Sequence, residues 1–158
     1  METTKQPLIT VVMPNYNGHR FVEQAIDSVL NQTYPNFELL VVDDCSKDDS
    51  LQLVQQKAQS DDRVRVIALE HNAGVANARN VGIKEAKGKF IALLDNDDLW
   101  TEDKLERQLA LANKGADIVY CSYDFIDEQN NPIKKPFIVP QQTNFNNCLL
   151  YTSPSPRD

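Results

Sequence analysis

Short apolar runs alternate along the chain with longer segments in which apolar residues recur every three or four positions. The runs LITVVM, FELLVV, VRVIAL, FIALL and IVYCSY predict buried strands at residues 8–13, 37–42, 64–69, 90–94 and 118–123. Helical spacing predicts four helices between them, at about residues 21–30, 51–58, 75–83 and 105–112. Pro35 would end the first helix, Gly88 the third and Gly115 the fourth, and Ser46 with Asp49 resembles a capping box for the second.

This alternation predicts an α/β fold, with a mostly parallel sheet and helices on both faces. We expect one domain over residues 8–135, preceded by a short tail at 1–7 and followed by an irregular tail at 136–158. The last eight residues, YTSPSPRD, carry no element pattern. They are interpreted either as a non-native addition or as an ordinary C-terminus.

Composition narrows the function classes. The chain has 158 residues, of which 41% are hydrophobic, so it can bury a core and is not disordered throughout. Its net charge of -7 argues against nucleic-acid binding. Cys45, Cys121 and Cys148 are too scattered for a zinc site or a disulfide framework, and no apolar run approaches a membrane span. We therefore expect a cytoplasmic domain whose contact with a membrane is peripheral or made through segments outside this sequence.

Parallel sheets of this kind bind ligands beyond the carboxyl ends of their strands, so the residues there are the candidate site. After the first strand, Pro14 to Gly18 form a turn in which Tyr16 could face a nucleobase or be partly buried. After the second strand, Asp43 and Asp44 repel each other. One of them could cap the next helix, and the other could accept a hydrogen bond from a ligand.

The fourth strand is followed by Asp95-Asn96-Asp97-Asp98, which is the sharpest chemical signal. In an extended segment Asp95 and Asp97 point the same way, while Asn96 and Asp98 point away. Two such carboxylates suit a hard divalent cation, Mg²⁺ or Mn²⁺, whose other ligands would be water or phosphate oxygens. The alternative is an acidic loop in which Asp98 caps the next helix.

Other signals are weaker. Arg79 could contact a diphosphate or a base, or form a surface salt bridge. His19 and His71 are interpreted as surface or loop residues. The segment GIKEAKGKF at 82–90 only mimics a P-loop, because its glycines are one residue too far apart and Phe90 stands where a hydroxyl would bind magnesium.

Four ordered motifs together resemble the family 2 glycosyltransferases, which have the GT-A nucleotide-sugar-binding fold. They are VVMPNYNG (11–18), AIDSVLNQTYPNFELLVVDDCS (25–46), NAGVANARNVGI (72–83) and FIALLDNDDLW (90–100). The resemblance spans about residues 7–131 and is more specific than any one of these motifs alone.

The resemblance also implies roles for particular residues. Uracil of a UDP-sugar would contact Pro14 and Tyr16, and its N3–H would be accepted by Asp44, with Asp43 beside it. The nucleotide-binding set further includes Arg79 and Asn96, and the sugar and diphosphate would be met by Asp95, Asp97, Asp98 and Trp100. Asp97, with Asp95, would hold the metal ion.

The implied reaction is transfer of a sugar, with inversion, from a nucleotide-sugar donor to the hydroxyl of a saccharide or lipid-linked acceptor. Bacterial surface polysaccharide or glycolipid synthesis at the inner face of the membrane is the expected setting. In the family the general base lies well downstream of the DxD motif, in a second part of the chain that binds the acceptor, and nothing after Asn131 matches. The resemblance therefore implies that the GT-A domain here is truncated and lacks its acceptor half. The chain is therefore expected to bind a nucleotide diphosphate weakly and to transfer little sugar.

Three alternatives come from other classes. A non-catalytic UDP-sugar-binding module would share every motif, so only turnover by a longer parent protein could separate it from an enzyme. A phosphoacceptor signalling domain would carry acids after strands one and three, whereas here they follow strands two and four. A sugar nucleotidyltransferase would need a glycine-rich basic first loop, which residues 15–20 match poorly.

Overall fold

The computed structural model describes residues 6–140 and divides the chain into two units, one ending at Ala110 and the other beginning at Leu111. In chain order, the elements are β1 (Ile9–Asn15), α1 (Val22–Leu30), β2 (Phe37–Asp43), α2 (Ser50–Ser60), β3 (Val64–Ala68), α3 (Val75–Glu85), β4 (Phe90–Leu93) and α4 (Lys104–Ala112). Four predicted strands and four predicted helices are confirmed. No helix in the described part of the chain is long and apolar enough to cross a membrane.

The sheet is entirely parallel, in the order β3-β2-β1-β4. All residues of β1 and β2 are buried, as expected of central strands that are covered on both faces. Pro14 is tolerated near the end of β1 because pairing with β4 stops at Val12, so its missing N–H removes no bond on that side.

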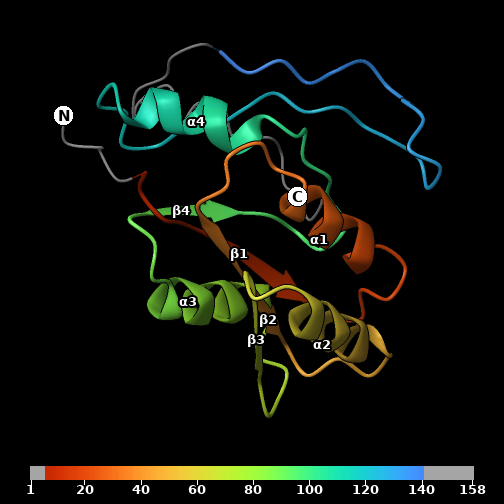
Figure 1. Ribbon diagram of the computed structural model, residues 1–158. Helices are drawn as coiled ribbons and strands as arrows, with labels where there is room; N and C mark the ends of the chain where they lie inside the picture. The colour runs from red at the N-terminus through yellow and green to blue at the C-terminus, as the bar shows by residue number, and fades with distance from the viewer. Residues whose placement is uncertain (1–5, 141–158) are drawn as a thin grey trace. The chain divides into compact units, whose positions relative to one another are not determined.

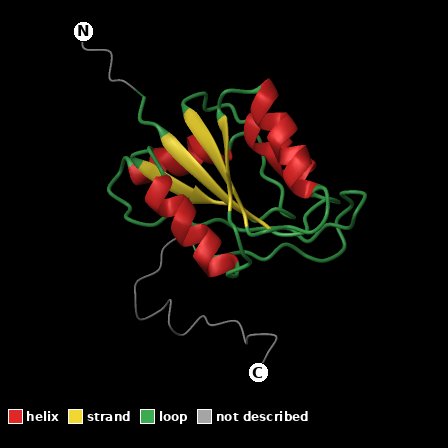
Figure 2. Cartoon of the chain, turned by 90° about the horizontal axis from the view of Figure 1, so that it is seen from below, coloured by secondary structure: helices red, strands yellow, loops and turns green. Residues whose placement is uncertain are grey.

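Helices lie on both sides of the sheet, as predicted (Figures 1 and 2). Alternate residues of β1 and β2, among them Val11 and Leu39, pack in one cluster with α1, α2 and Leu105 of α4. On the other face Leu40 and Val42 of β2 pack with Ala78 of α3, and Val12 of β1 lies against Gly82 of the same helix. The strand period of two therefore divides the core into two layers.

Two glycines allow close packing. A Cβ on Gly82 of α3 would collide with a methyl group of Val12, so this helix lies directly on the sheet. Gly88 does not end α3, which stops at Glu85, and that prediction is wrong. Its N–H instead donates to the Thr10 hydroxyl at 2.8 Å, and a Cβ there would collide with the backbone of β1.

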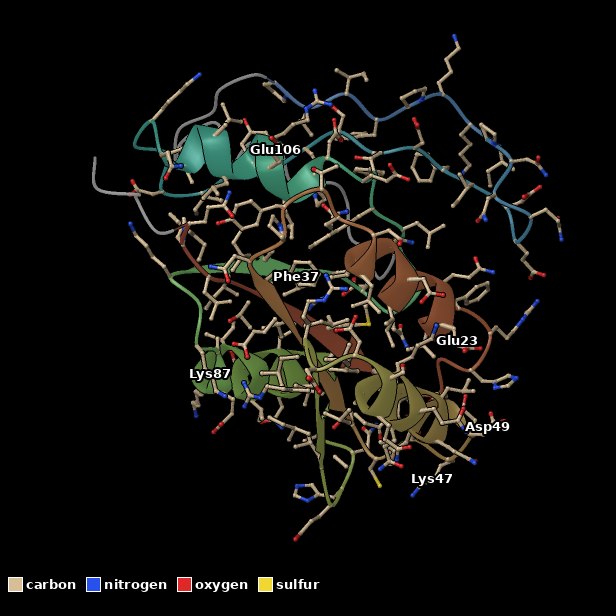
Figure 3. All side chains as sticks on the ribbon, in the orientation of Figure 1. Glu23, Phe37, Lys47, Asp49, Lys87 and Glu106 are labelled. Carbon is tan, nitrogen blue, oxygen red and sulfur yellow. The ribbon has the colours of Figure 1, made fainter. Side chains whose placement is uncertain are left out.

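Glu38 is a buried carboxylate that ties β1, β2, β3 and the α3–β4 loop together. It accepts hydrogen bonds from the Thr10 hydroxyl at 2.6 Å, the Lys87 N–H at 2.8 Å and the Arg65 guanidinium at 2.8 Å. Burial raises the pKa of Glu38, but these bonds together outweigh it and hold that pKa below its ordinary value. Figure 3 shows Lys87 beside the end of α3.

Two further predictions are wrong. Ser46 does not cap α2, because its hydroxyl and N–H both bond to Asp43, while the first N–H of the helix, that of Ser50, donates to Asp48 at 3.0 Å. Residues 118–123 form no strand, since the described part of the second unit has only isolated bridges, Tyr123 with Phe137 and Ile126 with Pro132. The predicted C-terminal tail from residue 141 onward, including YTSPSPRD, lies outside the described residues.

Candidate functional site

A cavity of about 360 Å³ opens at the carboxyl ends of β1, β2 and β4, where the sequence predicted a ligand site. Its walls come from the end of β1, the residue after β2, the start of α3 with its preceding loop, and the turn after β4. The lining residues are Pro14, Asn15, Tyr16, Asp44, Asn72, Gly74, Val75, Ala78, Asp95, Asn96 and Asp97. Segments that are far apart in the sequence thus converge on one cavity within the first unit.

Asp44 is a buried carboxylate on the cavity wall. Its two oxygens accept hydrogen bonds from the N–H groups of Ala73 at 2.8 Å and Gly74 at 2.7 Å. These donors stand at the N-terminus of α3, where the helix dipole also favours a negative charge. A carboxylate has about four acceptor positions, so these bonds leave capacity for a donor from a ligand.

Asp43 points away from the cavity and is fully buried. One of its oxygens accepts from the Asn15 amide at 2.7 Å and from the Ser46 hydroxyl at 2.6 Å, and the other from the Ser46 N–H at 3.0 Å. The paired aspartates are therefore divided: Asp44 faces the cavity, whereas Asp43 holds the loop after β2 to the tip of β1.

The acidic segment after β4 is a turn rather than an extended chain, because the Asp98 N–H donates to the Asp95 carbonyl at 3.2 Å. Asp95 and Asp97 both line the cavity, as expected, and Asn96 lines it too, contrary to the predicted alternation. Burial, together with the charges of Asp97 and Asp95, raises the pKa of Asp98. Asp98 does not cap α4, which begins at Lys104.

The remaining predicted residues are spread around the cavity. Arg79 on α3 forms an ion pair with Asp95 through Nη2, while its buried Nε atom has no partner. Tyr16 is half exposed at the cavity. Trp100 is not among the lining residues, since its ring packs against the core cluster of β1 and β2 and lies under the Lys104 ammonium.

Some of the cavity residues were not singled out from the sequence. Asn15 lay within the recognised turn motif, but its burial at the tip of β1 was not expected. Asn72 donates to the Asp44 carbonyl at 3.1 Å and closes the wall beside Gly74. In the sequence both look like ordinary polar residues of loops. Predicting their place at the cavity would have required knowing which loops come together in the fold.

The described residues hold no cluster of three or more His, Cys, Asp or Glu side chains arranged for a metal ion. Of the three carboxylates that line the cavity, that of Asp44 already accepts the N–H groups of Ala73 and Gly74. Asp95 and Asp97 offer the remaining carboxylate oxygens, and Asp95 is paired with Arg79. This donor set fits a hard cation only if further oxygen atoms come from a bound ligand or water.

Comparison with known proteins gives three findings. The model of the family described as "Glycosyl transferase family 2" matches residues 10–154, which extends past the motifs that ended near Asn131. The putative teichuronic acid biosynthesis glycosyltransferase TuaG of Bacillus subtilis is 35% identical over 95% of this chain and 60% of its own length. The Escherichia coli protein WfgD, named a UDP-Glc:alpha-D-GlcNAc-diphosphoundecaprenol beta-1,3-glucosyltransferase, is 41% identical over 90% of this chain and 55% of its own.

Solved structures give the same picture of the fold. S. aureus TarS 1-349 in complex with UDP-GlcNAc has a TM-score of 0.63 and 34% identity, covering 67% of this chain and 31% of that one. The mannosyltransferase PcManGT from Pyrobaculum calidifontis, in complex with GDP-Man and Mn²⁺, has a TM-score of 0.63 and 29% identity, covering 67% and 32%. The predicted GT-A fold is confirmed. The chain spans little more than half the length of TuaG and WfgD.

Proposed function

The chain belongs to glycosyl transferase family 2, and from that premise we propose that its cavity binds the nucleotide diphosphate of a sugar donor. The observation that carries the proposal is the convergence of a buried acceptor carboxylate, Asp44, with the two carboxylates Asp95 and Asp97 on one cavity. Binding of UDP-GlcNAc by TarS and of GDP-Man by PcManGT supports a nucleotide sugar as the ligand.

The base of the nucleotide would lie between Tyr16 and Asp44. The half-exposed ring of Tyr16 offers a flat apolar face, and Asp44 accepts the imide N–H of a uracil while the start of α3 holds its carboxylate in place. UDP is our choice of nucleotide because TarS binds UDP and WfgD is named for UDP-Glc. Pro14 closes the wall beside the base, and Asp43 acts by supporting the loop.

Asp97, with Asp95, would hold Mg²⁺ or Mn²⁺ together with oxygen atoms of the diphosphate. When bound, the cation offsets the negative charge that builds up on the departing diphosphate. Arg79 would bind the diphosphate as well. Its guanidinium already pairs with Asp95 beside the proposed cation, and its fork of N–H donors also suits a phosphate. The family resemblance would also bring Asp98 and Trp100 near the sugar, although neither side chain lines the cavity.

The transfer itself would invert the anomeric carbon as an acceptor hydroxyl replaces the nucleotide, after a general base removes the hydroxyl proton. We assign that base to no described residue. The acceptor would be a saccharide or a lipid-linked saccharide, in polysaccharide or glycolipid synthesis at the inner face of the bacterial membrane. The names of TuaG and WfgD support this setting.

Calorimetric titration of UDP into the chain, with Mn²⁺ and with EDTA, tests the donor site. We expect binding that Mn²⁺ strengthens, and we expect Asp97→Ala to remove most of that gain. Asp62→Ala, at an exposed aspartate that follows α2, is the matched control and should bind as the wild type does. The absence of UDP binding by a chain whose circular dichroism shows it to be folded would refute the proposal.

A further inference from the structure

Asn15 lines the cavity at the tip of β1 and is the centre of a buried polar network. Its amide nitrogen donates to Asp43 at 2.7 Å and to the Ser50 hydroxyl at 3.0 Å. Its amide oxygen accepts from the side-chain nitrogen of Asn96 at 2.8 Å, 81 residues along the chain. One side chain, only 1% exposed, therefore joins β1 to the end of β2, to α2 and to the acidic turn after β4.

The orientation of the Asn15 amide follows from its partners. The carboxylate of Asp43 can only accept, so the amide nitrogen of Asn15 must face it and the amide oxygen must face the opposite way, toward Asn96. Gly18 leaves the space that this contact needs, because a Cβ there would collide with the Asn96 nitrogen and with the Asn15 oxygen. Asp43, Asn96 and the space beside Gly18 together fix this contact.

We propose that Asn96 is a positioning residue, whose bond to Asn15 holds the acidic turn so that Asp95 and Asp97 face one cavity. This inference rests on the proposed function of the site. Like charges so close together repel, and a turn that carries three aspartates in four residues would spread without an anchor. Asn96 supplies an uncharged anchor between the two carboxylates, and a fully buried partner receives it.

A positioning role and a direct ligand role for Asn96 predict different binding data. A nucleotide ligand would contribute to UDP affinity with and without a metal ion. A residue that positions Asp95 and Asp97 would leave UDP affinity in EDTA almost unchanged and would weaken only the additional affinity that Mn²⁺ provides. The ratio of the two affinities therefore separates the roles.

The experiment measures UDP binding by calorimetry for wild type and Asn96→Ala, in EDTA and in Mn²⁺. We expect the Mn²⁺-dependent gain to fall roughly tenfold in Asn96→Ala, the size of one lost buried hydrogen bond, with UDP affinity in EDTA within about twofold of wild type. Asn80→Ala, at an exposed asparagine of α3, controls for loss of an amide and should change neither value. An unchanged Mn²⁺ gain, or equal losses in both conditions, would overturn the proposal.

Gly18→Ala provides a second route to the same contact. It should displace the Asn96 amide and reproduce the lost Mn²⁺ gain, and it should add much less in the Asn96→Ala background, since both changes act on one contact. Additive effects would contradict the proposal.

A ligand-free measurement separates failure of this inference from failure of the proposed function. Backbone ¹⁵N relaxation of the free chain should show Asp95 and Asp97 ordered in the wild type and mobile on the picosecond-to-nanosecond timescale in Asn96→Ala. If wild type binds no UDP, the proposed function fails while this test still applies. If the turn stays as ordered in Asn96→Ala as in the wild type, the anchor itself is refuted.

Discussion

Replacing Asp44 by asparagine tests whether the carboxylate on the cavity wall is also a structural cap for α3. The side chain is 2% exposed, and each oxygen accepts one backbone N–H, from Ala73 at 2.8 Å and from Gly74 at 2.7 Å. Asparagine has a single acceptor oxygen, so one of these N–H groups would face an NH₂ group in Asp44→Asn. The substitution keeps the shape of the side chain and removes one acceptor and the charge.

The expected loss follows from these two changes. A hydrogen bond to a charged group contributes about 1.5–3 kcal/mol. The interaction of the charge with the helix N-terminus adds about 0.3–1 kcal/mol. Relief of the cost of burying a charge offsets part of this sum. We therefore expect the free energy of unfolding to fall by about 2–3 kcal/mol in Asp44→Asn.

Urea unfolding at pH 7, followed by circular dichroism, measures this change. Asp62→Asn, at an exposed aspartate, should stay within about 0.5 kcal/mol of wild type. A loss below about 0.5 kcal/mol in Asp44→Asn would refute the capping role and leave Asp44 as a residue that serves only the ligand. UDP titration of the folded variant then reports the binding role separately.

Three further predictions concern the fold around the site. Gly82→Ala should lower the free energy of unfolding in urea by about 1–3 kcal/mol, because the added Cβ would collide with Val12 of β1. That loss exceeds the gain in helix propensity, which is at most about 1 kcal/mol. Unchanged stability would contradict direct contact between α3 and the sheet. Because the folded pKa of Glu38 is lowered, its charge stabilises the fold above its ordinary pKa of 4.5, and that contribution is lost as the pH falls through the folded value. The difference in unfolding free energy between wild type and Glu38→Gln, measured in urea from pH 7 to pH 3, should therefore be largest at neutral pH and shrink in acid. Glu23→Gln, at an exposed glutamate, should differ little from wild type at any pH. A difference for Glu38→Gln that grew in acid would show that folding raises the pKa of Glu38 instead of lowering it. Arg79→Ala should change the free energy of unfolding by less than about 1 kcal/mol, because the side chains of its ion pair with Asp95 are 34% and 45% exposed and solvent screens their attraction. A loss above about 2 kcal/mol would show instead that the guanidinium stabilises the fold.

Local periodicity was enough to predict most of the sheet and its helices. The runs that became β1 and β2 are apolar at nearly every position because both faces of a central parallel strand are buried, and this requirement is visible without knowing the partners. The same reasoning placed Asp44, Asp95 and Asp97 at a ligand cavity, because strand ends of a parallel sheet share one edge.

Residues 118–123 show where local pattern was insufficient. The run is apolar enough to be a strand, yet Ile118 is 82% exposed, and the described residues around Tyr123 offer only isolated bridges. A strand is stabilised by its neighbours, so an apolar run becomes one only where the tertiary structure brings another strand beside it.

Polar partners were likewise decided by the tertiary structure. Ser46 had a plausible acceptor role at a helix start, but Asp43 lies closer in space and takes both of its donors. Asn15 and Asn96 are ordinary loop residues in the sequence, and their hydrogen bond exists because β1 and β4 are adjacent and Gly18 leaves room between them. Hydrophobic burial follows from the period of each segment, whereas a hydrogen bond depends on the distance and direction between two groups, which only the folded chain sets.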